Sequence, residues 1–167
     1  MAMFGGGGRQ RAAEQVYVNV YDLSPANEYL FGLGLGIYHS GLEVYGTEYT
    51  FGSGGGVFSH QPKEANGAKW RVRLYLGDIH IGSREVEAAV ASLRENFHGD
   101  RYSLVNLNCN HFADALARKL LGRGLPGWIN RMAFLGSYCS CLMPPEMAGE
   151  APVQAPGGGG GGGGGRA

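Results

Sequence analysis

Hydrophobic and polar residues alternate in two segments of the first half of the chain, which predicts β-strands. In residues 16–20 (VYVNV) the three valines occupy alternate positions and face one side of a strand. In residues 70–76 (WRVRLYL) Trp70 is expected to share a face with Val72, Leu74 and Leu76. Each segment therefore predicts a strand with one apolar face.

Shorter apolar runs between these two segments predict further strands. Residues 36–45 (GIYHSGLEVY) are expected to form two short strands around a turn at Ser40-Gly41. Residues 48–51 (EYTF) and 57–58 are expected to be strands on either side of a glycine-rich loop at 52–56. The first half of the chain is thus predicted to be rich in β-structure.

Helical spacing replaces alternation in the second half of the chain. One helix is expected to begin at a Ser83 cap and to be ended by Gly99, and a second at 108–121 to be ended by Gly122. A third, short helix is expected at 128–134. Strands followed by helices indicate an α+β domain.

Glycine is concentrated at both ends of the chain. The sequence contains 31 glycines in 167 residues, with unbroken runs at 5–8 and 157–165. We expect disorder in the Gly/Arg-rich residues 1–15 and in the Pro/Gly-rich tail 146–167, because neither has enough apolar residues to bury. Residues 16–145 are long enough for one domain with a single core.

Charge and cysteine content exclude several classes of protein. Fourteen basic and fourteen acidic residues give a formal net charge of zero, so we expect no nucleic-acid partner. No apolar run approaches the length of a membrane-spanning helix, and the N-terminus lacks the apolar core of a secretory signal. The odd set Cys109, Cys139 and Cys141 argues against a disulfide framework and indicates a reducing compartment. The expected location is the cytoplasm, with the nucleus as a second compartment.

The segment Asn108-Cys109-Asn110-His111 combines a helix cap with a cysteine. If Asn108 caps the helix, Cys109 is its first residue, where free N–H groups and the helix dipole stabilise a thiolate. We therefore expect a lowered thiol pKa and a reactive nucleophile; the alternative is a small buried core residue. His111 is only two positions further and points to the opposite side, so it is a poor base and the pair is a poor metal site.

His39 is better placed to act as a base. It ends a predicted strand on the same face as Ile37 and is followed by the small residues Ser40 and Gly41. From a strand end an imidazole can reach across a cleft to a helix N-terminus. The alternative is a histidine of the core or its rim.

With His39 and Cys109 both in view, the chain resembles the PPPDE family, the permuted papain-fold peptidases that include the desumoylating isopeptidases, and is nearest to their second type. The resemblance covers about residues 16–145. It implies a small antiparallel sheet or barrel packed against helices, with the catalytic cysteine at a helix N-terminus. The matching segments occur in the family's order and are VNVYD at 18–22, GIYHSGLEVYG at 36–46, NCNHF at 108–112 and WINR at 128–131.

The resemblance implies a catalytic dyad of Cys109 and His39, with Asn108, Asn110 and His111 as oxyanion or supporting residues. Cys109 would attack the carbonyl of a modifier's C-terminal glycine and form a thioester, and His39 would protonate the leaving lysine amine. The N–H of Cys109 is a natural oxyanion donor. No second donor and no residue that orients His39 can be assigned from the sequence, and no cofactor or metal is implied.

The implied partners are proteins modified with ubiquitin or SUMO, and the family also includes homodimers. A narrow channel for the modifier's Gly-Gly end is expected beside Gly41, Gly52 and Gly54. A bulky residue at Gly41 is expected to slow cleavage and to spare the fold. Two other functions stay open: a protein S-acyl (palmitoyl) thioesterase, which uses the same acyl-enzyme chemistry, and a module that binds a modifier without turnover.

Overall fold

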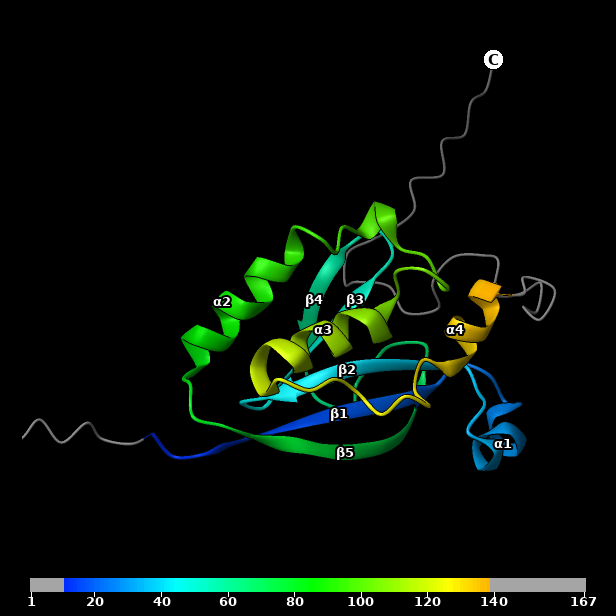
Figure 1. Ribbon diagram of the computed structural model, residues 1–167, viewed down its shortest axis with the longest axis horizontal. Helices are drawn as coiled ribbons and strands as arrows, with labels where there is room; N and C mark the ends of the chain where they lie inside the picture. The colour runs from blue at the N-terminus through cyan, green and yellow to red at the C-terminus, as the bar shows by residue number, and fades with distance from the viewer. Residues whose placement is uncertain (1–10, 139–167) are drawn as a thin grey trace, which may run out of the picture.

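The structure, a computed structural model, describes residues 11–138. Five antiparallel strands form one sheet in the order β4-β3-β2-β1-β5, with β4 and β5 at its edges. The sheet and several helices confirm the predicted α+β architecture (Figure 1). The strands are β1 Glu14–Asp22, β2 Tyr38–Val44, β3 Thr47–Gly52, β4 Gly56–His60 and β5 Lys69–Ile79. The helical elements are α1 Asn27–Leu30, η1 Phe31–Leu33, α2 Ser83–Arg94, η2 Gly99–Arg101, α3 Cys109–Leu121 and α4 Arg131–Tyr138.

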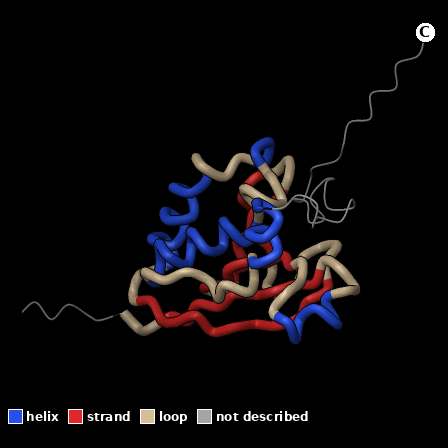
Figure 2. Tube along the Cα trace, turned by 45° about the vertical axis from the view of Figure 1, so that its right-hand side comes forward, coloured by secondary structure: helices blue, strands red, loops and turns tan. Residues whose placement is uncertain are grey.

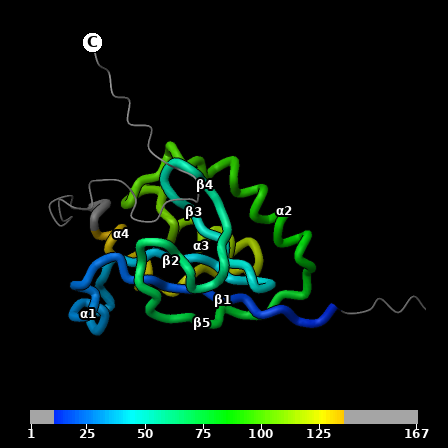
Figure 3. The backbone as a smooth tube through the Cα atoms, turned by 180° about the vertical axis from the view of Figure 1, so that it is seen from behind, coloured from blue at the N-terminus to red at the C-terminus, as the bar shows by residue number. Residues whose placement is uncertain are grey.

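Helices α2 and α3 lie on one side of the sheet, as the blue and red tubes of Figure 2 show. Helix α3 contacts β2, β3 and β5, and α2 packs against α3. Helices α1 and α4 lie at one end of the molecule and α2 toward the other, both from the front and from behind (Figures 1 and 3). Helix α3 is therefore the central helix of the fold.

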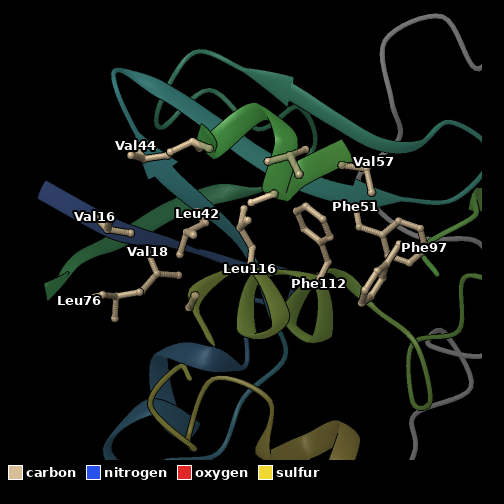
Figure 4. Close-up of a cluster of buried hydrophobic side chains, with 14 of the residues drawn as sticks. Val16, Val18, Leu42, Val44, Phe51, Val57, Leu76, Phe97, Phe112 and Leu116 are labelled. Carbon is tan, nitrogen blue, oxygen red and sulfur yellow. The ribbon is translucent and has the colours of Figure 1, made fainter. Parts of the chain in front are cut away.

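The core lies between the sheet and α3 (Figure 4). Val16, Val18 and Val20 of β1 are fully buried, which confirms the face predicted from their alternation. Phe112 and Leu116 of α3 are also fully buried. Each such side chain contributes about 1.5–3 kcal/mol on burial, so this layer holds α3 firmly against the sheet.

Strand β2 is continuous, and the predicted turn at Ser40-Gly41 is wrong. Both residues pair with β1. The chain turns instead at Tyr45-Gly46, where φ is 51° and 68°, as in the type I′ turns that join antiparallel strands. Position 41 has no room for a side chain, because a Cβ there would lie 2.6 Å from Cγ of Glu48.

Strand β5 contains a β-bulge that changes the face of Trp70. The register with β1 shifts between Val20 and Tyr21, so that Trp70 lies opposite Tyr21. There its Nε1 donates to Oδ1 of Asn19 at 3.3 Å. The prediction that Trp70 shares a face with Val72 is therefore wrong, since an extra residue in one strand reverses the alternation.

Helix boundaries agree with the prediction best for α3. Its N-cap is Asn108, and Gly122 ends it in the left-handed region with φ 71°. Helix α2 is capped by Gly82 rather than Ser83, because the Gly82 N–H donates to the Glu85 carboxylate at 2.6 Å. That helix ends at Arg94, before Gly99, and α4 begins three residues later than predicted.

The predictions for the two ends of the chain fall largely outside the residues that the structure describes. Strand β1 begins at Glu14, two residues before the predicted strand. Disorder was expected in residues 1–15, but Glu14 and Gln15 are the first residues of β1. Residues 1–10, the tail 146–167, Cys139 and Cys141 lie outside the described range. Within residues 11–138, every helix is too short or too polar to cross a membrane.

The sheet face opposite α3 carries a buried polar cluster around Glu48. The fully buried carboxylate accepts hydrogen bonds from Asn19 Nδ2 and the Tyr21 hydroxyl, both at 2.8 Å, and from the Lys63 N–H at 3.0 Å. Burial raises the pKa of Glu48, and these hydrogen bonds act in the opposite direction. Three donors thus hold the carboxylate in one place behind β2.

Candidate active site

Cys109 is the first residue of α3 and is 2% exposed. Asn108 caps the helix, since its Oδ1 accepts the N–H of His111 at 3.0 Å. In return Nδ1 of His111 accepts the N–H of Asn108 at 3.1 Å. This reciprocal pair satisfies two of the backbone donors that a helix start leaves free. The predicted cap and the supporting position of His111 are thus present around the cysteine.

The Cys109 thiol is enclosed by polar groups. It donates to Oδ1 of Asn110 at 3.8 Å and accepts from the Tyr102 hydroxyl at 3.8 Å. The backbone of Ser40 also hydrogen-bonds to it and lowers its pKa, but burial is the larger effect and raises the pKa of the thiol above its ordinary value. The lowered pKa predicted from the helix position is therefore wrong, because removal of water outweighs the helix end.

Asn110 ties the start of α3 to β2. Its Nδ2 donates to the backbone carbonyl of Tyr38 at 2.9 Å, and its Oδ1 accepts from the Ser40 hydroxyl at 2.7 Å. Tyr38 and Ser40 flank His39 in the strand. One amide side chain therefore fastens the residue next to Cys109 to both sides of His39.

Asn130 joins the supporting residues from the segment before α4. Its Oδ1 accepts from Nδ2 of Asn108 at 3.0 Å and from Nδ2 of Asn110 at 3.2 Å. Its Nδ2 lies 3.1 Å from Nε2 of His111. No role was predicted for Asn130. The feature that could have indicated one is its position in the segment WINR, which matches the family. It unites the three residues that the resemblance named as supports.

His39 is 1% exposed and lies in β2 opposite Tyr21, with the two rings 5.5 Å apart. Its Nε2 is 3.3 Å from Oγ1 of Thr50, and this hydroxyl donates its only proton to the Ser40 carbonyl at 2.9 Å. Thr50 must therefore accept from Nε2–H, which leaves the lone pair on Nδ1. Thr50 supplies the orienting contact that no sequence pattern predicted.

The protonation of His39 follows from its burial. Loss of water lowers the pKa of His39 to about 3, and the nearby His60 contributes in the same direction. The imidazole is thus neutral at neutral pH and can accept a proton. Among the described residues no hydrogen bond joins His39 to Cys109, and His39 does not line the cavity at Cys109; its ring contacts Tyr21 and Thr50. Asn110 links the start of α3 only to the neighbours of His39.

A small cavity of about 20 Å³ adjoins Cys109. This is room for one water molecule. Its walls come from residues 36–38, from Tyr102 and Leu104, from the start of α3 and from residues 129–133 around the start of α4. Apolar side chains form much of the wall, and the thiol and the amides of Asn108, Asn110 and Asn130 supply polar groups.

The predicted channel glycines are absent from the described wall of this cavity. Gly41 lies against Glu48, in the polar cluster, where a Cβ would lie 2.6 Å from Cγ of Glu48, so a bulky residue there is now expected to disturb the fold. Gly54 donates its N–H to the carbonyl of Gly99 at 3.2 Å, and Gly52 pairs with Gly56 in the same loop. That loop packs on η2. Within residues 11–138, no group of three or more metal-binding side chains occurs.

Comparison with known proteins agrees with the motifs. Residues 14–147 match the family model described as "PPPDE putative peptidase domain". A DeSI-like protein of Arabidopsis thaliana is 40% identical over 139 residues, which cover 81% of this chain and 62% of that protein. A desumoylating isopeptidase 1 homolog of Caenorhabditis elegans is 40% identical over 136 residues, which cover 77% of this chain and 41% of the nematode protein.

Human desumoylating isopeptidase 1 is 33% identical over 130 residues, which cover 68% of this chain and 71% of the human protein. The chain spans less than two thirds of the length of the plant and nematode relatives. The match to the family model covers most of the chain and includes the segments around His39 and Cys109. The chain therefore belongs to the PPPDE peptidase family.

Proposed function

We propose that this protein is a cysteine isopeptidase that removes SUMO or a related ubiquitin-like modifier from lysines of target proteins. The observation that carries the proposal is the capped start of α3, where Cys109 adjoins a cavity and Asn110 binds both neighbours of His39. The names of the relatives support SUMO as the first modifier to test.

The first step is proton transfer from Cys109 to His39. Burial raises the pKa of the thiol and lowers that of the imidazole, which favours a neutral pair in the resting enzyme over a thiolate–imidazolium ion pair. Nδ1 of His39 takes the thiol proton as the sulfur attacks the carbonyl carbon of the modifier's last glycine. A C–S bond forms, and the carbonyl electron pair moves to oxygen.

The second step breaks the isopeptide bond. The oxyanion returns its electron pair, the C–N bond breaks, and His39 gives its proton to the lysine nitrogen. A water molecule then attacks the thioester carbonyl and gives a proton to His39. The C–S bond breaks, the modifier leaves as a carboxylic acid, and His39 returns the proton to the Cys109 sulfur. The N–H of Cys109, at the start of α3, donates to the oxyanion in both halves of the reaction.

Substrate entry requires a wider opening than this structure has. A cavity of about 20 Å³ holds a water molecule and not a peptide segment. A Gly-Gly end, which has no side chains, is the peptide that needs the least additional space. The walls that must move are the apolar residues before and within α4 and the segment 36–38 at the start of β2.

A location in the cytoplasm or nucleus, where SUMO conjugates occur, belongs to this proposal.

A modifier carrying an electrophile at its C-terminal glycine tests the proposal. The SUMO probe should label the wild-type protein and the exposed-histidine control His80→Ala, and should label neither Cys109→Ala nor His39→Ala. A ubiquitin probe compares the two modifiers. Labelling only by a long-chain acyl thioester probe indicates the palmitoyl thioesterase, and binding of SUMO without labelling indicates the non-catalytic module; either result overturns the isopeptidase proposal.

A further inference from the structure

Tyr102 is the only side chain outside α3 within the described residues that hydrogen-bonds to the Cys109 thiol. Its hydroxyl donates to Sγ at 3.8 Å, and the backbone of Cys109 also hydrogen-bonds to the phenol. Tyr102 lines the same cavity as Cys109. The hydroxyl therefore lies beside both the sulfur and the N–H at the start of α3.

The packing around Tyr102 holds this hydroxyl in place. Its ring lies 5.2 Å from the ring of Phe51, which is fully buried in β3. The residue directly follows η2, and η2 is fastened to the β3–β4 loop by the Gly54–Gly99 hydrogen bond. The glycine-rich loop that sequence patterns suggested as a substrate channel thus supports the segment that carries Tyr102.

Tyr102 is also suited to remain a donor. Burial and the neighbouring Cys109 raise the pKa of its phenol, so the phenol keeps its proton at neutral pH. A neutral donor in a largely buried site stabilises a developing negative charge strongly.

We propose that Tyr102 is a further catalytic residue, which donates its hydroxyl hydrogen bond to the Cys109 sulfur as the thiolate forms and then to the oxyanion of the tetrahedral intermediate. The proton of the phenol is not transferred in either step. As the C–S bond forms, negative charge moves from sulfur to the carbonyl oxygen, and the hydrogen bond follows it. Tyr102 thereby supplies the second oxyanion donor beside the Cys109 N–H. This role rests on the isopeptidase reaction proposed above, but its first half can be tested without a modifier.

The test is the Tyr102→Phe variant, which keeps the ring against Phe51 and removes only the hydroxyl. In a Cys139→Ser/Cys141→Ser background Cys109 is the only thiol, and its alkylation by iodoacetamide is followed by mass spectrometry from pH 6 to pH 10. We expect alkylation near pH 7 to slow about tenfold, the effect of one hydrogen bond to a charged group. The difference should narrow toward pH 10, as the ionised fraction of the thiol rises in both proteins.

The matched control is Tyr45→Phe, which removes a phenol that donates to the Ile81 carbonyl at 2.7 Å, outside the cavity at Cys109. It should leave the alkylation profile unchanged. Turnover of a SUMO conjugate by Tyr102→Phe should fall about 100-fold in kcat with little change in KM, as for the loss of one oxyanion donor.

The outcomes separate the two proposals. Equal alkylation profiles for wild type and Tyr102→Phe overturn the role of Tyr102 at the thiolate. Slower alkylation of Tyr102→Phe in a protein that does not cleave SUMO or ubiquitin conjugates supports the contact with the thiolate and overturns the isopeptidase function. Slower alkylation with unchanged kcat limits Tyr102 to the thiolate and overturns its role at the oxyanion.

Discussion

The contact between Gly41 and Glu48 makes a small substitution unusually costly. In Gly41→Ala the new Cβ would lie 2.6 Å from Cγ and 2.7 Å from Cδ of Glu48, and closer still to Oε1. Glu48 cannot move aside freely, because its buried carboxylate holds the Asn19 amide, the Tyr21 hydroxyl and the Lys63 N–H. Disturbing two hydrogen bonds to a buried charge costs about 3–6 kcal/mol at about 1.5–3 kcal/mol each.

We therefore expect Gly41→Ala to lower the free energy of unfolding by about 3 kcal/mol or more in urea denaturation at pH 7. Gly127→Ala is the matched control, since a Cβ there meets nothing within 4 Å. The double variant Gly41→Ala/Glu48→Ala should lose less stability than the two single losses added together, because the clash has been removed. A Gly41→Ala protein within about 0.5 kcal/mol of wild type would refute this account of β2.

Three further predictions concern the site residues. His39 is held neutral with a pKa of about 3 in the fold, whereas the unfolded chain binds a proton below about pH 6.5; stability should therefore fall as the pH drops through the range from about 6.5 to 3, by at most about 1.4 kcal/mol per unit from this residue. Urea unfolding at pH 7 and pH 5 should show that His39→Asn loses less unfolding free energy between these two pH values than wild type does. An equal loss in both proteins would contradict a neutral, buried His39. Asn108→Ala should lower the unfolding free energy by about 1–2 kcal/mol through loss of the cap, and Asn106→Ala, an exposed side chain nearby, should change it little. Asn110→Ala should slow labelling by the SUMO probe at least tenfold while the fold persists by circular dichroism, since it frees α3 from the strand of His39; labelling at the wild-type rate would show that this tie is not needed.

Local patterns predicted what depends on neighbours in the chain. The alternation of Val16, Val18 and Val20 determines which face of β1 is buried, because successive side chains of a strand point to opposite sides. The cap at Asn108 and the stop at Gly122 define α3, since the backbone groups at helix ends need local partners. These short-range rules are sufficient to place Cys109 at a helix start.

Only tertiary contacts decided the rest. Ser40-Gly41 has the composition of a turn, but β1 pairs with both residues and Glu48 requires the glycine. The helix end by itself favours an acidic thiol, but the packing of β2 and Tyr102 over Cys109 removes water and raises its pKa. Tyr102, Thr50 and Asn130 reach the site from three separate segments. The sequence by itself thus pointed to the candidate residues His39 and Cys109, and the fold determined their protonation and partners, because burial and long-range hydrogen bonds depend on segments distant in the chain.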